Sequence, residues 1–219
     1  MKFASYDRIL FTGDSVTDAG RARPVGEGNH TGVGTGYVRV VESLLAAFYP
    51  ELMLRISNTG TSGNTVRDLA ERWQTDILDL KPDWLYVCIG VNDVWRQYDL
   101  PTIPTRHVYP EEYETTLRRI LTEAKAVTKG ITLMTPYYME PLTADPMRAR
   151  MDEYGAICRR IADELQLNFI DTQAMFDAYF AHRHSSSIAW DRIHPNQTGA
   201  TLLARAILDE AGFDWAHRA

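Results

Sequence analysis

Cysteine is scarce in this sequence, and its scarcity argues against two classes of small protein, those held together by disulfides and those built around a zinc ion. Only Cys88 and Cys158 occur among the 219 residues, far apart and without a C-x-x-C spacing. A disulfide scaffold or a zinc knuckle needs more cysteines, closely spaced. A chain of this length can bury enough apolar surface to fold without either. Because two unpaired thiols suit a reducing compartment, we expect a cytoplasmic protein.

Long apolar runs and clusters of positive charge are also missing. No segment approaches the ~20 apolar residues that a membrane-spanning helix needs, and residues 1–8 lack the apolar core of a signal peptide. The net charge is −6, and Lys and Arg form no basic cluster of the kind that nucleic-acid-binding proteins use. We therefore expect a soluble, non-exported protein that binds neither a membrane nor a nucleic acid.

The sequence does contain a regular alternation of strand-like and helix-like segments. Short apolar runs predict five strands, near 8–11, 52–56, 84–89, 131–134 and 167–170. Asn64 is a candidate helix cap, and apolar residues at helical spacing predict helices near 37–49, 64–80, 113–127, 147–165, 172–181 and 196–211. This alternation is typical of a parallel sheet with helices on both faces. No repeat or low-complexity segment interrupts it, so we expect one domain over residues 1–219.

Polar residues gather where these predicted strands end and just before the last helix. The segments are TGDSVTD at 12–18, NTGTSGN at 58–64, GVND at 90–93 and DRIHP at 191–195. Ligands of open parallel sheets bind at the carboxyl ends of the strands. We therefore expect all four segments to meet at one edge of the sheet.

The residue types in these segments suit nucleophilic acyl transfer. Ser15 is the candidate nucleophile, and a serine hydroxyl needs an adjacent base to react. His194 is the candidate base, and Asp191, three residues earlier, can hold its Nδ1 proton and stabilise the imidazolium. A tetrahedral intermediate also needs donors for its oxyanion. The backbone N–H groups of Ser15 and Gly63 and the side-chain amide of Asn92 can supply three.

The same residues resemble a known family. GDSV at 13–16, Gly63, GVND at 90–93 and DRIH at 191–194 resemble the four sequence blocks of the SGNH/GDSL hydrolases, over about residues 8–211. The resemblance implies an α/β fold, a three-layer flavodoxin-like sandwich with strand order 2-1-3-4-5. It also implies a Ser15–His194–Asp191 triad, with Gly63 and Asn92 as oxyanion donors. Val16 replaces the leucine of the family name, an apolar exchange that leaves the chemistry intact.

Within that family the chain is most similar to bacterial acetylxylan and oligosaccharide acetyl esterases, on its compact size, GVND at 90–93 and Trp190 before Asp191. That resemblance implies an acetylated oligosaccharide substrate, no metal or other cofactor, and a homo-oligomer, a dimer or a ring such as an octamer. Aromatic rings suit the apolar faces of sugars, and several are expected in loops near the site. The candidate substrate-binding residues are Asp14, Trp190, Trp95 and Tyr98, with Tyr137 and Tyr138 also in such loops.

Several of the candidate site residues have an alternative interpretation. Gly60 is an alternative to Gly63 as the glycine of the second sequence block. We prefer Gly63 because the polar pair Asn64-Thr65 follows Gly63. Asp14 can be a helix cap rather than a substrate contact, and the cap is favoured. Asp93 is expected to hold the Asn92 segment rather than to bind substrate. Trp190 and Trp215 can serve an interface as well as a substrate, and Asp191 with His194 can simply cap the last helix.

Other functions remain open from the sequence alone. The same fold can act on longer acyl esters or thioesters. A metal-dependent phosphoesterase could use oxygen and nitrogen ligands from Asp14, Asn29, His30, Asn92 and His194, although Thr31 follows where an acid is expected. A flavodoxin-like module binding FMN or a glycan is a non-enzymatic alternative. The absence of G-x-S-x-G argues against the nucleophile elbow of the α/β-hydrolases.

Overall fold

The computed structural model describes residues 1–28 and 30–218, and its centre is one parallel sheet. The order of the five strands in the sheet is β2-β1-β3-β4-β5, as predicted. All neighbouring strands run parallel, and Gly13 lies opposite Cys88. The strands are β1 (Arg8–Gly13), β2 (Arg55–Asn58), β3 (Trp84–Cys88), β4 (Gly130–Met134) and β5 (Asn168–Ile170).

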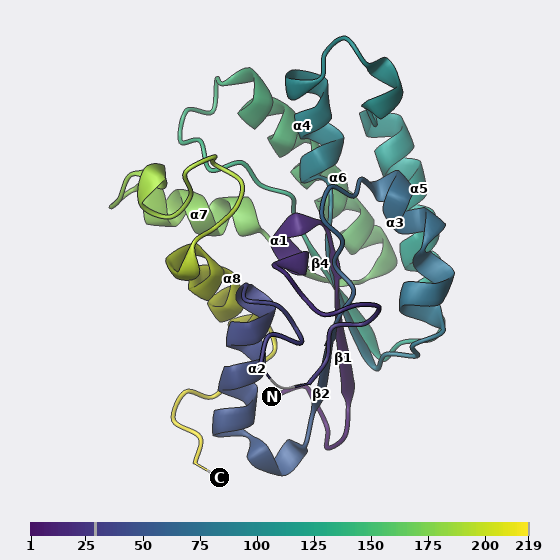
Figure 1. The fold of residues 1–219 in the computed structure, drawn as a ribbon, viewed down its shortest axis with the longest axis vertical. Coiled ribbons are helices and arrows are strands. Elements are labelled where there is room, and N and C mark those ends of the chain that lie inside the picture. The colour runs from purple at the N-terminus through teal and green to yellow at the C-terminus, as the bar shows by residue number, and fades with distance from the viewer. Residues whose placement is uncertain (29, 219) are drawn as a thin grey trace.

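Helices cover both faces of the sheet, which confirms the predicted three-layer sandwich (Figure 1). On one face α2 packs against α8, which also contacts α7; on the other, α5 packs against α3 and α6, and α6 packs against α4. The helices are α1 (Ser15–Asp18), α2 (Tyr37–Phe48), α3 (Val66–Glu71), α4 (Val91–Asp99), α5 (Pro110–Lys125), α6 (Pro146–Leu165), α7 (Thr172–Phe180) and α8 (Gln197–Glu210). Short 3₁₀ turns occupy 50–52, 104–106 and 185–187, and a π-helical turn occupies 74–78.

The core lies between the sheet and these two helical layers. The central strands β1 and β3 are apolar on both faces because helices cover both sides of them. Each covering helix packs one row of apolar side chains against the core. In α5 this row comprises Tyr113, Leu117, Ile120, Leu121 and Ala124. The predicted core residues Trp73, Tyr113 and Met134 are all buried, and so are both cysteines. Among the described helices none is long and apolar enough to cross a membrane.

Three local predictions are wrong. The second strand is Arg55–Asn58 rather than 52–56, because residues 50–52 form a 3₁₀ turn and Met53 is left-handed at φ 46°. The cap of α3 is Thr65, not Asn64, and it forms a capping box with Asp68. Residues 91–99 form the helix α4, where we expected a loop.

Candidate active site

The first segment of the site is the sharp turn from β1 into α1. Gly13 is required there because a Cβ at this position would lie 2.0 Å from the Cys88 carbonyl oxygen of the neighbouring strand. The next residue, Asp14, caps α1 by accepting a hydrogen bond from the Val16 N–H at 3.0 Å. Ser15 therefore stands at the first position of a helix, at the carboxyl edge of the sheet, with its side chain half-buried.

His194 and Asp191 reach Ser15 from a loop 176 or more residues later in the chain, just before α8. The Ser15 Oγ lies 2.7 Å from His194 Nε2, and His194 Nδ1 lies 2.5 Å from Asp191 Oδ2. Since the carboxylate only accepts, Nδ1 carries the proton and Nε2 is free to accept the Ser15 proton. The structure thus brings the three predicted triad residues into one hydrogen-bonded line.

The loop that carries this pair is built to hold the carboxylate in place. Asp191 Oδ1 accepts the backbone N–H groups of Ile193 at 3.0 Å and His194 at 2.8 Å. Burial raises the pKa of Asp191, but the hydrogen bonds from His194 and Ile193 outweigh it and bring the pKa below its usual value. The Tyr137 hydroxyl donates to the Ile193 carbonyl at 3.1 Å. Asp191 is therefore ionised and fixed opposite the imidazole.

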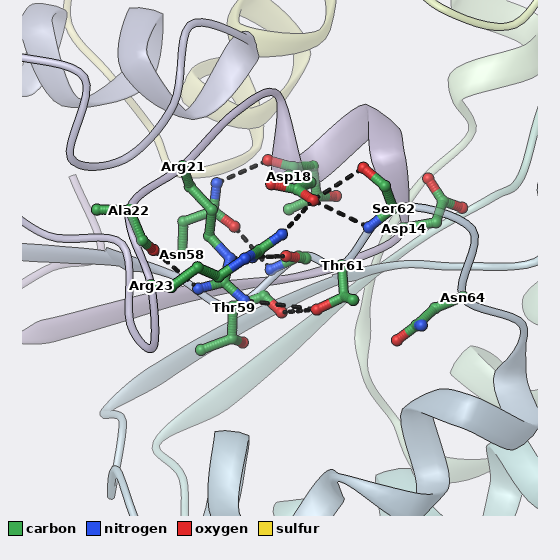
Figure 2. Close-up of polar contacts among 12 residues, drawn as sticks. Asp14, Asp18, Arg21, Ala22, Arg23, Asn58, Thr59, Thr61, Ser62 and Asn64 are labelled. Atoms are coloured by element: carbon green, nitrogen blue, oxygen red, sulfur yellow. Dashed lines mark hydrogen bonds and ion pairs between the residues drawn. The ribbon is translucent and has the colours of Figure 1, made fainter.

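The second segment presents a backbone N–H beside α1. Gly63 has φ +82°, a left-handed conformation that favours glycine, and its N–H has no acceptor within residues 1–28 and 30–218. Its neighbour Ser62 is anchored, because the Ser62 N–H and hydroxyl both donate to Asp18 Oδ2, at 2.9 and 2.8 Å. Figure 2 shows this carboxylate also receiving the Arg23 guanidinium, at 2.6 Å. Asp18 lies on α1, so it ties the helix of Ser15 to the Gly63 segment.

The third segment is the first turn of α4. Asn92 lies there with its side chain buried; its Nδ2 donates to the Asn64 carbonyl at 3.0 Å, and its Oδ1 accepts from Arg96 Nη2 at 3.0 Å. These contacts use only one of the two Nδ2 protons, so the second is available to a bound group. Gly90 begins the turn at φ +128°, where a Cβ would lie 2.8 Å from the Tyr113 hydroxyl. The contact to Asn64 places the Asn92 amide next to the Gly63 segment.

Two buried acids lie next to these residues. Burial raises the pKa of Asp14 to about 7, although the hydrogen bond from the Val16 N–H acts to lower it. Burial likewise raises the pKa of Asp93 to about 8, although the Val66 N–H donates to it at 2.9 Å. Asp93 thereby joins α4 to the start of α3, the holding role that we expected. Asp14 is only 2% exposed and acts as a cap, so its burial does not support the predicted substrate contact.

The predicted aromatic residues lie at different distances from the triad. The ring of Trp95 lies 6.1 Å from the His194 ring, centroid to centroid. Tyr98 interacts with another part of the chain instead of the triad: its hydroxyl donates to the Pro146 carbonyl at 2.7 Å, at the start of α6. Both stand on α4 rather than in the loop that we expected, which is a correction. Trp190 is 89% exposed, directly before Asp191.

A hollow of about 460 Å³ opens beside Gly63. It is lined by residues at and just before the start of α3, by Arg96 on α4, and by the segment after α4. The lining residues are Gly63, Thr65, Arg67, Asp68, Arg96, Leu100, Ile103, Thr105 and Arg106. Most of these residues are polar or charged, and Leu100 and Ile103 are the apolar members. The hollow gives a polar group bound at Gly63 room to extend over the 100–106 segment.

The residues considered as metal ligands do not form a metal centre in the part of the chain that the structure describes. Within it, no three His, Cys, Asp or Glu side chains converge in a way that could hold an ion. Asp14 is occupied as a cap, and His194 contacts Ser15 and Asp191. Asn29, one of the suggested ligands, lies outside the described residues. The contacts of His194 with Ser15 and Asp191 are those that a serine nucleophile needs.

Three supporting residues were missed in the sequence. Asp18 anchors Ser62, and Arg72 donates to the Gly13 carbonyl at 3.0 Å and to Asn64 Oδ1 at 2.7 Å. Arg96 holds the Asn92 oxygen. Arg96 follows Asn92 by four residues, the spacing of one helix face, so recognising α4 as a helix would have found it. No comparable local signal identifies Asp18 or Arg72, because Ser62 lies 44 residues from Asp18 and Gly13 lies 59 residues from Arg72.

Comparison with known proteins gives extensive matches. The chain is 53% identical over 215 residues to an acetylxylan esterase from Geobacillus stearothermophilus, covering 98% of each chain. Three solved structures of that esterase, each 52% identical and covering 100% of both chains, are described as catalytic mutants: H194A with a TM-score of 0.98, and S15A and D191A, each with 0.97. A solved α/β-hydrolase from the metagenome of Lake Arreo, Spain, is 48% identical, with a TM-score of 0.95 over 97% of this chain and 98% of that one.

The model of one protein family also matches most of the chain. It is the GDSL-like lipase/acylhydrolase family, and the match covers residues 11–202. This range includes all four segments that meet at the carboxyl edge of the sheet. Together with the full-length relative and the Ser15–His194–Asp191 line, the match establishes that the chain belongs to the GDSL-like lipase/acylhydrolase family.

Proposed function

We propose that this chain is a serine esterase that removes acetyl groups from xylo-oligosaccharides or related sugars, with Ser15, His194 and Asp191 as its catalytic residues. The observation that carries the proposal is the hydrogen-bonded line of 2.7 and 2.5 Å through these three side chains. The substrate class rests on the acetylxylan esterase that is 53% identical over nearly the whole chain. Its catalytic mutants alter the same residue types at the same numbers, which supports the three roles.

The first half of the reaction transfers the acetyl group to the enzyme. Ser15 Oγ attacks the acetyl carbonyl carbon while His194 Nε2 accepts the hydroxyl proton, across the 2.7 Å contact. The ionised Asp191 stabilises the resulting imidazolium. The tetrahedral intermediate then collapses, the bond to the sugar oxygen breaks, and His194 donates its proton to that oxygen. The sugar leaves with a free hydroxyl, and acetyl-Ser15 remains.

The second half restores the enzyme. His194 deprotonates a water molecule, which attacks the acetyl-Ser15 carbonyl, and acetate leaves as Ser15 regains its proton. In both halves the negative oxygen faces the Ser15 N–H, the Gly63 N–H and the second Nδ2 proton of Asn92. The open N–H of Gly63 and the fixed Asn92 amide support this assignment. Removing one such donor usually costs about 10²–10³ in kcat.

The surroundings of the triad favour a small acyl group on a polar molecule. The bulky Trp95 ring stands beside His194, an arrangement that favours a short acyl chain over a long one. The polar hollow beside Gly63 offers room for the sugar chain along residues 100–106. Trp190, exposed directly before Asp191, is positioned to contact either a sugar or a second copy of the chain. Tyr98, bonded to the Pro146 carbonyl, is a weaker candidate for a substrate contact.

Acyl-chain selectivity and acetate release test this function together. We expect acetate release from acetylated xylo-oligosaccharides, and a steep fall in kcat/KM from acetyl to butanoyl to octanoyl p-nitrophenyl esters. The reason is that the bulky Trp95 ring stands beside His194, which favours a short acyl group. A preference for octanoyl esters would instead identify a lipase or thioesterase. No turnover of any ester, or bound flavin in the purified protein, would overturn the esterase assignment.

We also propose a cytoplasmic homo-oligomer. Both cysteines are buried free thiols, which suits a reducing compartment. Trp190 and Trp215 are 89% and 46% exposed, an unusual exposure for large apolar side chains and one that contact with another subunit would reduce. Sedimentation velocity tests the assembly: a dimer or a ring such as an octamer is expected, and a monomer at micromolar concentration would contradict it.

A further inference from the structure

We propose that Arg96 is a positioning residue that fixes the orientation of the Asn92 amide and so aims its free N–H at the oxyanion. This inference rests on the proposed function, because it takes Asn92 as an oxyanion donor. The juxtaposition that carries it is the 3.0 Å contact from Arg96 Nη2 to Asn92 Oδ1, across one turn of α4.

An asparagine amide needs such a guide because its two ends have nearly the same shape. If the Asn92 side chain turned over, its oxygen would face the developing oxyanion and repel it. The two neighbours of the amide prevent this. The Asn64 carbonyl can only accept a hydrogen bond, so it selects Nδ2, and the Arg96 guanidinium can only donate, so it selects Oδ1. Both contacts specify the same orientation, which leaves the second Nδ2 proton as the one open donor.

Arg96 is itself held on two further sides. Its guanidinium forms an ion pair with Asp99, one turn later on the same helix. It also lies over the Trp95 ring, 4.8 Å from the ring centre, and Trp95 in turn lies beside His194. A planar guanidinium packed against an aromatic ring loses little freedom when it forms a hydrogen bond. Arg96 thereby links the oxyanion donor Asn92 to the aromatic ring beside the catalytic base.

A hydrogen bond from a cation is stronger than one between neutral groups, and it polarises the amide that accepts it. A more polarised amide has a more positive N–H, so Arg96 also strengthens the donor that it aims. Neither effect requires Arg96 to touch the substrate. Arg96 does line the hollow beside Gly63, however, so a direct contact with the sugar is the competing role.

A double-mutant cycle on p-nitrophenyl acetate separates these roles, because this ester carries an acetyl group but no sugar. We expect Arg96→Met to lower kcat about tenfold with KM changed less than twofold, and Arg96→Lys to recover part of the loss. In an Asn92→Ala background, Arg96→Met should change kcat less than twofold, since the group through which Arg96 acts is gone. The matched control is Arg119→Met, which removes an exposed arginine paired with Glu123 on α5 and should leave kcat unchanged.

The results of this cycle separate a failure of the Arg96 inference from a failure of the proposed function on which it rests. If Asn92→Ala keeps the wild-type kcat, Asn92 is not an oxyanion donor and the proposed site itself is wrong. If Asn92→Ala lowers kcat but Arg96→Met lowers it equally in both backgrounds, only the positioning role of Arg96 is refuted. A loss confined to KM for acetylated xylobiose would assign Arg96 to sugar binding instead. Should Arg96→Met fail to fold, the same cycle with Arg96→Ala decides the question.

Discussion

Replacing Asp191 by asparagine should abolish turnover without disturbing the loop that carries it. The reason lies in the two oxygens of the carboxylate, which have different partners. Oδ1 accepts the N–H groups of Ile193 and His194, at 3.0 and 2.8 Å, while Oδ2 faces His194 Nδ1 at 2.5 Å. In Asp191→Asn the amide oxygen must stay with the two backbone donors. The amide nitrogen then faces the imidazole and donates to Nδ1.

This forced orientation reverses the histidine tautomer. Once Nδ1 accepts, the ring proton resides on Nε2, which lies 2.7 Å from Ser15 Oγ and can no longer take the serine proton. The loss of the correct tautomer in such a triad lowers kcat about 10⁴-fold near neutral pH. We expect a drop of that order in Asp191→Asn, with a thermal midpoint close to that of the wild type.

The assay is initial-rate hydrolysis of p-nitrophenyl acetate at pH 7, with thermal unfolding measured in parallel. Asp171→Asn is the matched control, because Asp171 caps α7 through the Ala174 N–H and asparagine caps a helix equally well. It should retain full activity. An Asp191→Asn enzyme within tenfold of the wild type would refute the tautomer argument.

Three further substitutions test the supporting structure. Burial raises the pKa of Asp14 to about 7, above the usual value of 3.8 for an aspartate, so between these pH values the native state holds the extra proton and stability falls as pH rises. Asp14→Asn keeps the cap and should gain stability over the wild type from pH 4 to pH 8, by up to about 4 kcal/mol at about 1.4 kcal/mol per pKa unit; a pH-independent difference in urea unfolding would contradict this. Asp18→Ala releases the Ser62 N–H and hydroxyl, so kcat should fall at least tenfold with KM little changed, whereas a wild-type kcat would show that the Gly63 segment needs no anchor. Gly13→Ala places a methyl group 2.0 Å from the Cys88 carbonyl oxygen and should destabilise the fold by about 3 kcal/mol, so an unchanged thermal midpoint would be evidence against that close approach.

The strands and the main helices were predictable because their signals are strong and local, whereas the order of the strands in the sheet came from the family resemblance. Short, solid apolar runs such as 84–89 are typical of strands covered on both faces, and α5 repeats its apolar residues at helical spacing. The strand β2 was displaced in the prediction because its last two residues, Ser57 and Asn58, are polar yet buried. Asn58 is stabilised there by bonds from its Nδ2 to the Thr17 and Val33 carbonyls, which no local pattern reveals.

The reacting residues of the candidate site were predictable from the sequence, but few of the residues that hold them in place were. Ser15, Asp191 and His194 follow from residue chemistry and from the motifs in which they stand. The helix α4 was missed because Gly90 and Asn92 suggest a turn, although Gly90 is in fact the N-cap directly before the helix. Consequently Trp95 and Tyr98 were expected in a loop, and the Arg96 contact went unseen. Contacts such as Asp18 to Ser62 join residues that only the folded chain brings together.

The most direct test of the central claim is acetate release from an acetylated xylo-oligosaccharide in the presence of EDTA. It compares the wild type with Ser15→Ala and His194→Ala at equal concentration. We predict full release by the wild type despite the chelator, and a loss of nearly all turnover in both variants, which remain folded. Equal release by the wild type and Ser15→Ala would contradict the account, since Ser15 could then not be the group that accepts the acetyl.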